Sequence, residues 1–297
     1  MQEITAASYK LNKKIKDDSF NVDHLSEYCL SLQISSKLFR ICITDSSRNR
    51  CLLLEDYQFS HVQHPDQLIE TLQEIYDDHH LLQAGYWKSV KLALKTSNFS
   101  LVPNALFDQE FAKDYLNLNC TTSAINGDEV LFYKQNSTDV VNIFSADKKI
   151  INFFEAAYIG KKLKIVHHTS SLIEGIMVQN ANKDQREMFL YIEKDQLTVV
   201  IKKNRTLEFC NSFFFTTPED FVYYVMFVAE QLKFNPEKDD VTVWGDLLPD
   251  SSFVKKLSMY MCHIKFGNKP SSLYFGYNFD ELLDHNFFDL YNLHLCE

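Results

Sequence analysis

Residues 187–245 decide the fold of this chain and read EMFLYIEKDQLTVVIKKNRTLEFCNSFFFTTPEDFVYYVMFVAEQLKFNPEKDDVTVWG. Runs rich in β-branched and aromatic residues are separated by short polar turns, which predicts adjacent strands at 188–192, 197–203 and 207–214. Pro218 suits the first turn of a helix, where its missing N–H costs no hydrogen bond. The apolar run at 241–243 predicts a buried strand. The stretch therefore predicts a meander followed by a helix and a core strand.

The same order of elements occurs earlier in the chain, over residues 28–94. Alternating apolar residues typical of half-buried strands precede a helix that begins at Pro65, and a further alternating strand follows. Equivalent positions are separated by 160 residues at Tyr28 and Met188, by 153 at Pro65 and Pro218, and by 151 at Val90 and Val241. The spacing changes in turns, where insertions are tolerated. The chain therefore predicts an internal duplication.

The segment between the two repeats contains further patterns. Strands are predicted at 99–102, 130–134, 140–144 and from 163, and helices at 108–116, 150–157 and 170–179. Residues 180–186 are polar and typical of a linker. We therefore predict a mobile lead-in at 1–20, a first domain at 21–183 and a second domain at 184–297.

The helix of the second repeat is apolar on more than one side. One stripe recurs at helical spacing and aromatic residues fill the other sides; these are Phe221, Val225, Val228 and Leu232, then Tyr223, Tyr224 and Phe227. A helix that is apolar all round is typical of a position between two layers. We therefore predict that this helix is buried.

Composition and charge exclude several classes of protein. The chain has 297 residues, 45% hydrophobic and 24% charged, with a mean hydropathy of -0.23, as in ordinary globular proteins. Its 40 acidic and 30 basic residues give a net charge of -10, which argues against a nucleic-acid partner. The longest apolar run, 221–229, is shorter than the roughly 20 residues of a membrane-spanning helix. Seven cysteines without a CxxC pair favour reduced thiols in a cytoplasmic protein.

The duplicated order of meander, helix, strand and helix resembles the actin-like ATPase fold, a ribonuclease H-like architecture. Residues 100–103, Ser-Leu-Val-Pro, lead into a predicted helix as a strand ending in Val-Pro does in the first domain of those proteins. Residues 241–246, Val-Thr-Val-Trp-Gly-Asp, are similar to their adenosine-side strand and glycine pair. The whole chain is also similar to a bacterial family of uncharacterised proteins assigned this fold. The resemblance implies an α/β protein with mixed sheets, made of two tandem actin-like domains related by duplication.

The resemblance also implies a nucleotide site, and the residues at its positions depart from the family pattern. Actin-like enzymes hold the β- and γ-phosphates with two turns that combine an acidic residue with glycines, because backbone must approach phosphate closely. The first turn here contains Lys37 without either, and the second contains Asp195 without glycine. The adenosine pair is reduced to Gly245 beside Asp246. These four residues are the candidate cofactor-binding residues, and the plain alternative is that they are ordinary turn residues.

The low glycine content argues against phosphate binding, because phosphate-binding turns depend on glycine. The chain has 7 glycines in 297 residues, where ordinary usage is about 7%. We therefore predict no cofactor and a non-catalytic actin-like protein that acts as a binding or assembly module for an unidentified protein partner. The alternative is an ATPase or nucleotide switch that binds ATP with Mg²⁺ in the interdomain cleft near Gly245 and Asp246, through unorthodox loops.

Other motifs do not indicate an enzyme. The sequence contains no GxSxG, GxxxxGK[ST], HExxH or GxGxxG. Residues 77–80 read Asp-Asp-His-His, but neighbours on a helix diverge by ~100° and do not readily share one metal ion. His167 and His168 end a predicted strand, where we expect them to cap it or face solvent, with metal ligation as the alternative. The first strand, 28–34, lacks the carboxylates that a two-metal nuclease requires.

Aromatic residues concentrate at the end of the chain; they are Tyr274, Phe275, Tyr277, Phe279, Phe287, Phe288 and Tyr291. One interpretation is a terminal segment docked on its own sheet. The other is an apolar surface for a protein partner, because aromatic anchors carry much of the binding energy of interfaces. The sequence leaves both open.

Overall fold

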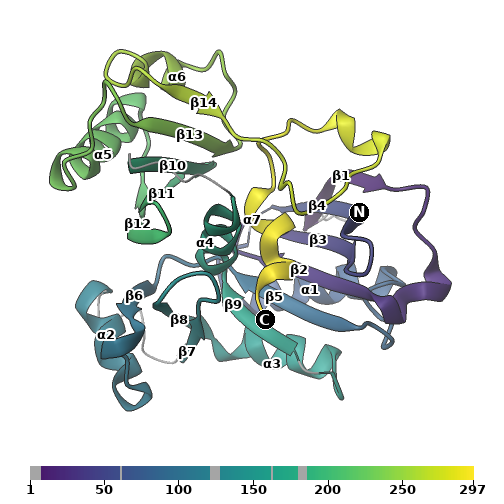
Figure 1. The fold of residues 1–297 in the computed structure, drawn as a ribbon. Coiled ribbons are helices and arrows are strands. Elements are labelled where there is room, and N and C mark those ends of the chain that lie inside the picture. The colour runs from purple at the N-terminus through teal and green to yellow at the C-terminus, as the bar shows by residue number, and fades with distance from the viewer. Residues whose placement is uncertain (1–7, 61, 121–127, 162, 180–185) are drawn as a thin grey trace, which may run out of the picture. The chain divides into compact units, whose positions relative to one another are not determined.

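The computed structural model describes residues 8–60, 62–120, 128–161, 163–179 and 186–297, which divide into two compact units (Figure 1). Unit 1 consists of Met1–Glu174, Ser272–Glu281 and Asp289–Glu297. Unit 2 consists of Gly175–Ser271 and Leu282–Phe288. The domain boundary predicted between residues 183 and 184 lies outside the described residues, which omit 180–185.

Unit 1 is built on a mixed sheet of six strands in the order β1-β4-β3-β2-β5-β9. The strands are β1 (Tyr9–Lys16), β2 (Tyr28–Ile34), β3 (Leu38–Asp45), β4 (Arg50–Phe59), β5 (Ser89–Leu94) and β9 (Leu163–His167). The first three pairings are antiparallel, whereas β2, β5 and β9 run parallel. Helices α1 (Pro65–Asp78) and α3 (Lys148–Ala157) cover one face, where the ring of Phe39 packs against Tyr76 and Phe154.

A smaller antiparallel sheet completes unit 1, in the order β6-β8-β7. Its strands are β6 (Phe99–Pro103), β7 (Asp128–Lys134) and β8 (Val140–Asp147), and α2 (Ala112–Asn119) packs on it through Leu116. Helix α4 (His168–Val178) follows β9 directly. The predicted strands and helices of this region are confirmed, but α2 begins later than expected because Asp108 caps a short 3₁₀ turn, Gln109–Phe111.

Strand β1 differs from the predicted mobile lead-in over residues 1–20. Tyr9–Lys16 pair antiparallel with β4 at the edge of the sheet. The lysines that suggested a lead-in lie on an exposed edge strand, and one of them, Lys14, forms an ion pair of 2.8 Å with the buried carboxylate of Glu55. That carboxylate also contacts Nε2 of His79 at 2.7 Å, and burial opposed by these partners leaves the pKa of Glu55 at about 2.

The end of the chain covers the second face of the sheet in unit 1. Lys91 Nζ donates to the carbonyl oxygen of His294 at 2.6 Å, and Leu290, Tyr291 and Leu293 are fully buried. Residues 289–297 therefore dock on the sheet of unit 1, although the predicted second domain, 184–297, includes them. Tyr274 and Tyr277, by contrast, are exposed.

Unit 2 is built on a mixed sheet of five strands in the order β12-β11-β10-β13-β14. The strands are β10 (Arg186–Glu193), β11 (Gln196–Lys203), β12 (Thr206–Phe214), β13 (Asp240–Gly245) and β14 (Ile264–Phe266). Helix α5 (Pro218–Gln231) packs on the sheet and begins at a capping box, in which the side chain of Thr217 accepts from Asp220 N and that of Asp220 accepts from Thr217 N. Helix α6 (Ser252–Leu257) packs beside α5.

Helix α5 is not buried all round, so that prediction is wrong. Its stripe of Phe221, Val225 and Val228 is fully buried in the core of unit 2, but Tyr223 is 61% exposed and Phe227 is 45% exposed. The described residues of unit 2 thus cover α5 on one side only.

The two sheets confirm the predicted duplication. In unit 1, β4-β3-β2-β5-β9 has the same order and the same strand directions as β12-β11-β10-β13-β14 in unit 2. In each unit a helix that begins with proline connects the meander to the first parallel strand. The predicted α/β class with mixed sheets and internally duplicated units is therefore correct.

Two further sequence observations have structural counterparts. All seven cysteines are free thiols, including Cys42 and Cys51, whose Sγ atoms lie 3.7 Å apart in the core. Among the described residues, the helices are too short or too polar to cross a membrane.

Candidate functional site

The carboxyl ends of the parallel strands in unit 1 converge on one edge of the sheet, which is where ligands bind in α/β proteins. Gln33 lies near the end of β2, Lys95 follows β5, and His168 follows β9. The chain places polar side chains here and nevertheless buries them, since Gln33 and His168 are inaccessible and Lys95 is 9% exposed. This edge is therefore the first candidate site.

A buried carboxylate, that of Asp289, is the centre of this cluster. Gln33 Nε2 donates to Asp289 Oδ2 at 2.7 Å, and Lys95 Nζ donates to the same oxygen at 3.4 Å. His168 Nδ1 lies 3.6 Å from that oxygen. Arg40 extends the network, because its Nη1 donates to Gln33 Oε1 at 3.1 Å and its Nε to Asp56 Oδ1 at 2.7 Å. We call these residues the Asp289 cluster.

The Asp289 cluster keeps its carboxylate ionised. Burial alone would raise the pKa of Asp289, but the positive charge of Lys95 and the nearby His168 and Arg40 hold that pKa well below its usual range. These cations compensate the charge of the buried carboxylate within the fold. The cluster therefore acts as a structural ion network at the position where a ligand would enter.

His167 beside the cluster is also engaged by the fold. Its Nε2 donates to the carbonyl oxygen of Thr96 at 3.0 Å, so Nδ1 is left to accept from the hydroxyl of Thr169 at 2.7 Å. Burial, and then the neighbouring His168, lower the pKa of His167 well below its ordinary value. Both histidines are fully buried, so the expectation that they face solvent is wrong.

The described residues contain no group of three metal-ligating side chains suited to an ion. The Asp-Asp-His-His run at 77–80 is not such a group, and its His79 contacts Glu55 instead.

The first predicted phosphate turn lies between β2 and β3 and contains Lys37. The hydroxyl of Ser35 accepts from the backbone N–H groups of Lys37 at 3.1 Å and Leu38 at 3.2 Å. The carbonyl oxygen of Lys37 accepts from Phe59 N at 3.0 Å. Backbone N–H groups are what such a turn offers to phosphate, and here a serine side chain of the same turn takes two of them.

The second predicted phosphate turn lies between β10 and β11 and contains Asp195. Lys194 has a φ of 51°, the left-handed region where glycine is usual. The carbonyl oxygen of Asp195 accepts from Phe215 N at 2.9 Å, which joins the turn to the end of β12. The turn therefore hydrogen-bonds to its own sheet through Asp195, and Lys194 takes the left-handed conformation without being a glycine.

Gly245 and Asp246 lie at the end of β13, beside the end of β10. Gly245 N donates to the carbonyl oxygen of His285 at 2.7 Å, and its own carbonyl oxygen accepts from Asn286 Nδ2 at 2.7 Å. Asp246 N donates to the carbonyl oxygen of Ile192 at 2.8 Å. Both backbone polar groups of this glycine are thus used in hydrogen bonds within unit 2.

The glycine is required there for a steric reason. Gly245 has a φ of 103°, and a Cβ atom added to it would lie 1.8 Å from the carbonyl oxygen of Ile192. Only a residue without a side chain allows β13 to end this close to β10. Gly245 is thus explained by the fold before any ligand is considered.

The structure places the four candidate residues in two groups. Asp195, Gly245 and Asp246 lie in unit 2 at the carboxyl ends of β10 and β13, while Lys37 lies in unit 1. Sequence reasoning missed the Asp289 cluster, although Gln33 and Arg40 are polar residues inside apolar strands and could have indicated it.

Known structures share the fold. A Bacteroides thetaiotaomicron protein with actin-like ATPase fold and unknown function superposes with a TM-score of 0.80 at 20% identity, covering 94% of this chain and 99% of that chain. PilM in the PilM–PilN type IV pilus biogenesis complex matches with a TM-score of 0.60 at 11% identity, covering 90% and 97%. The fold is therefore the actin-like ATPase fold.

The sequence was also compared with family models and with curated proteins. No curated protein matches it. Residues 17–264 match the family described as "Protein of unknown function (DUF3822)". This chain, with its duplicated actin-like sheets, belongs to that family.

Proposed function

We propose that this protein is a non-catalytic, cytoplasmic module that binds or assembles other proteins. The observation that carries the proposal is that the β2–β3 turn directs its own backbone N–H groups, at Lys37 and Leu38, to the Ser35 hydroxyl. Phosphate binding at that turn would have to displace this hydroxyl without help from a glycine. The Asp289 cluster fills the carboxyl-terminal edge of the sheet in the same unit with side chains that already pair with one another.

Two other observations support the proposal. PilM, a protein of this fold, occurs in a complex with PilN that serves type IV pilus biogenesis. The free thiols of Cys42 and Cys51, unbridged at 3.7 Å, are what a reducing compartment such as the cytoplasm maintains.

We expect Mg-ATP to give no saturable heat in isothermal titration calorimetry, even at millimolar nucleotide. A thermal-shift series checks the same point, because a ligand present at 100 times its Kd would stabilise the folded protein by about 2.7 kcal/mol. Mg²⁺ without nucleotide and AMP without Mg²⁺ are the controls.

Micromolar binding of ATP would contradict the proposal and favour a nucleotide switch. Asp246→Ala and Lys37→Ala would then show whether the predicted positions hold the nucleotide. Gly245 is unsuited to this test, because any side chain at that position collides with Ile192 whether or not ATP binds.

A further inference from the structure

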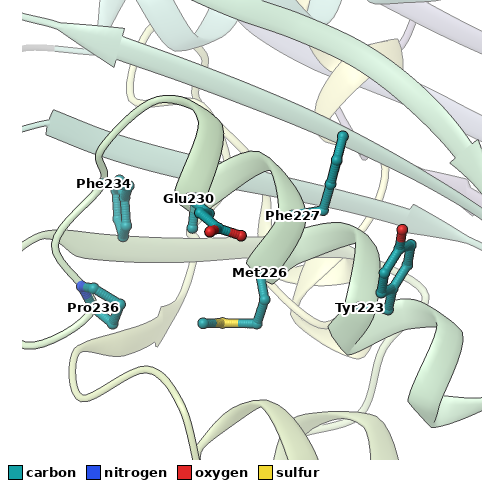
Figure 2. Close-up of a pocket in the computed structure, with 7 residues that line it drawn as sticks. Tyr223, Met226, Phe227, Glu230, Phe234 and Pro236 are labelled. Carbon is teal, nitrogen blue, oxygen red and sulfur yellow. The ribbon is translucent and has the colours of Figure 1, made fainter.

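Helix α5 presents an aromatic groove on the surface of unit 2. Its lining residues form a cavity of about 440 Å³ and come from α5 and the loop that follows it (Figure 2); they are Tyr223, Met226, Phe227, Ala229, Glu230, Phe234 and Pro236. We call this cavity the α5 groove.

The aromatic side chains of the α5 groove are arranged for contact with a partner. Tyr223 and Phe227 are one helical turn apart, and their rings stack with centroids 6.1 Å apart and planes inclined by 22°. They are 61% and 45% exposed. Paired aromatic rings of this exposure on a helix are typical of a binding surface, because they bury much apolar area with little loss of side-chain entropy.

The apolar surface continues beyond the α5 groove. A second cavity of about 630 Å³ shares Phe234 and Pro236 with it and reaches Met259 and Tyr260, which are 76% and 50% exposed. The two cavities together form an extended surface. Its length suits a segment of a partner chain better than a small metabolite.

One charge lies inside the α5 groove. Figure 2 shows the carboxylate of Glu230 with Phe234 and Pro236 on one side and Met226 and Phe227 on the other. Within the described part of the chain, this carboxylate has no hydrogen bond or ion pair. Lys233 and Glu237 line the neighbouring cavity and offset each other in charge.

This combination of groups selects a cation. A carboxylate attracts a positive charge, and the faces of aromatic rings attract it as well, most strongly for arginine. Apolar walls would then pack the methylene stem of the same side chain. The net charge of -10 adds a long-range attraction for a basic partner.

We propose that the α5 groove binds an apolar segment of a partner protein that carries an arginine or lysine, with its cation placed against Glu230. The inference names the partner's chemistry for the binding role proposed above and rests on it. A second copy of this chain is the competing occupant, and the test below distinguishes the two.

The test is selection of random peptides displayed on phage against three immobilised proteins: the wild type, Glu230→Lys and Glu70→Lys. We expect the wild type to enrich peptides in which Arg or Lys is flanked by apolar residues. Glu230→Lys should enrich Asp or Glu instead. Glu70→Lys, on an exposed position of α1 in unit 1, has the same change in net charge and should select like the wild type.

Fluorescence anisotropy then measures the affinity of a selected peptide for the three proteins. We expect its affinity to fall at least about tenfold with Glu230→Lys and to be unchanged with Glu70→Lys, as for the loss of a cation–carboxylate contact. Both glutamates are exposed, so both variants should keep the thermal transition of the wild type.

Three results would overturn the inference: no enrichment of cationic residues, the same enrichment with Glu230→Lys, or a dimer in sedimentation velocity that Phe227→Asp abolishes. The last would assign the groove to a second copy. Failure of the peptide selection leaves the non-catalytic role standing as long as Mg-ATP does not bind. Micromolar ATP binding overturns that role whatever the peptides do.

Discussion

Gly245→Ala is expected to unfold unit 2 or to leave it barely stable. A Cβ atom at this position lies 1.8 Å from the carbonyl oxygen and 2.7 Å from the carbonyl carbon of Ile192. Both are backbone atoms of β10, so no side-chain rotation relieves the collision, and the φ of 103° is itself unfavourable for alanine. We expect a loss of at least about 3 kcal/mol in the free energy of unfolding.

Urea denaturation measures the loss, and hydrogen–deuterium exchange locates it. Exchange should rise in the peptides of β10 and β13, which pair in parallel next to the glycine. Gly85→Ala is the matched control, since a Cβ there meets nothing within 4 Å and the free energy should change by less than about 1 kcal/mol. A Gly245→Ala variant as stable as this control would mean that the end of β13 moves away from β10 at little cost.

Asp289→Asn is expected to destabilise unit 1 by about 3 kcal/mol at neutral pH. The amide keeps the size of the carboxylate but removes the negative charge that faces the buried ammonium of Lys95. Removing one member of a buried ionic network costs more than the network contributes, because the remaining charge is still away from water. Glu70→Gln, an exposed carboxylate on α1, is the control and should be near neutral.

The effect of Asp289→Asn should depend on pH. The folded protein holds the pKa of Asp289 well below the value of about 4 that an unfolded aspartate has. The carboxylate therefore contributes stability above that pH, and the contribution is lost as the pH falls, because the unfolded chain then binds a proton that the folded one does not. The difference between the urea midpoints of the two proteins should narrow steadily as the pH falls below about 5. A difference that stays constant as the pH falls would show that the fold leaves the pKa of Asp289 at its unfolded value.

The fold could be predicted because its signals are local. Each signal lies within one element, as with the alternation in β2 and β10 and the proline at the start of α1 and α5. The repeated order of these elements then predicted the duplication. Strand β1 was missed because its apolar positions, such as Ile15, are few among lysines, and only pairing with β4 makes it a strand.

The candidate site was less accessible to sequence reasoning. Gln33 and Asp289 touch across 256 positions of sequence, so no spacing rule relates them. The hydrogen bonds from Lys37 and Leu38 to Ser35 depend on the conformation of the turn, which its residue types leave open. A pattern of apolar residues on α5 could not separate the face that packs on the core from the exposed face, which carries Tyr223 and Phe227.

The docking of residues 289–297 on unit 1 has a consequence for synthesis on the ribosome. Lys95 emerges early, but its carboxylate partner lies 194 positions later. At translation rates of about 5–20 residues per second, that interval is roughly 10–40 s. During this time one face of the sheet in unit 1 lacks its cover, so unit 1 cannot finish folding until residues 289–297 have left the ribosome. We therefore expect unit 1 to complete its structure only after unit 2 has been synthesised, and nascent chains that stop short of Asp289 to depend on chaperones.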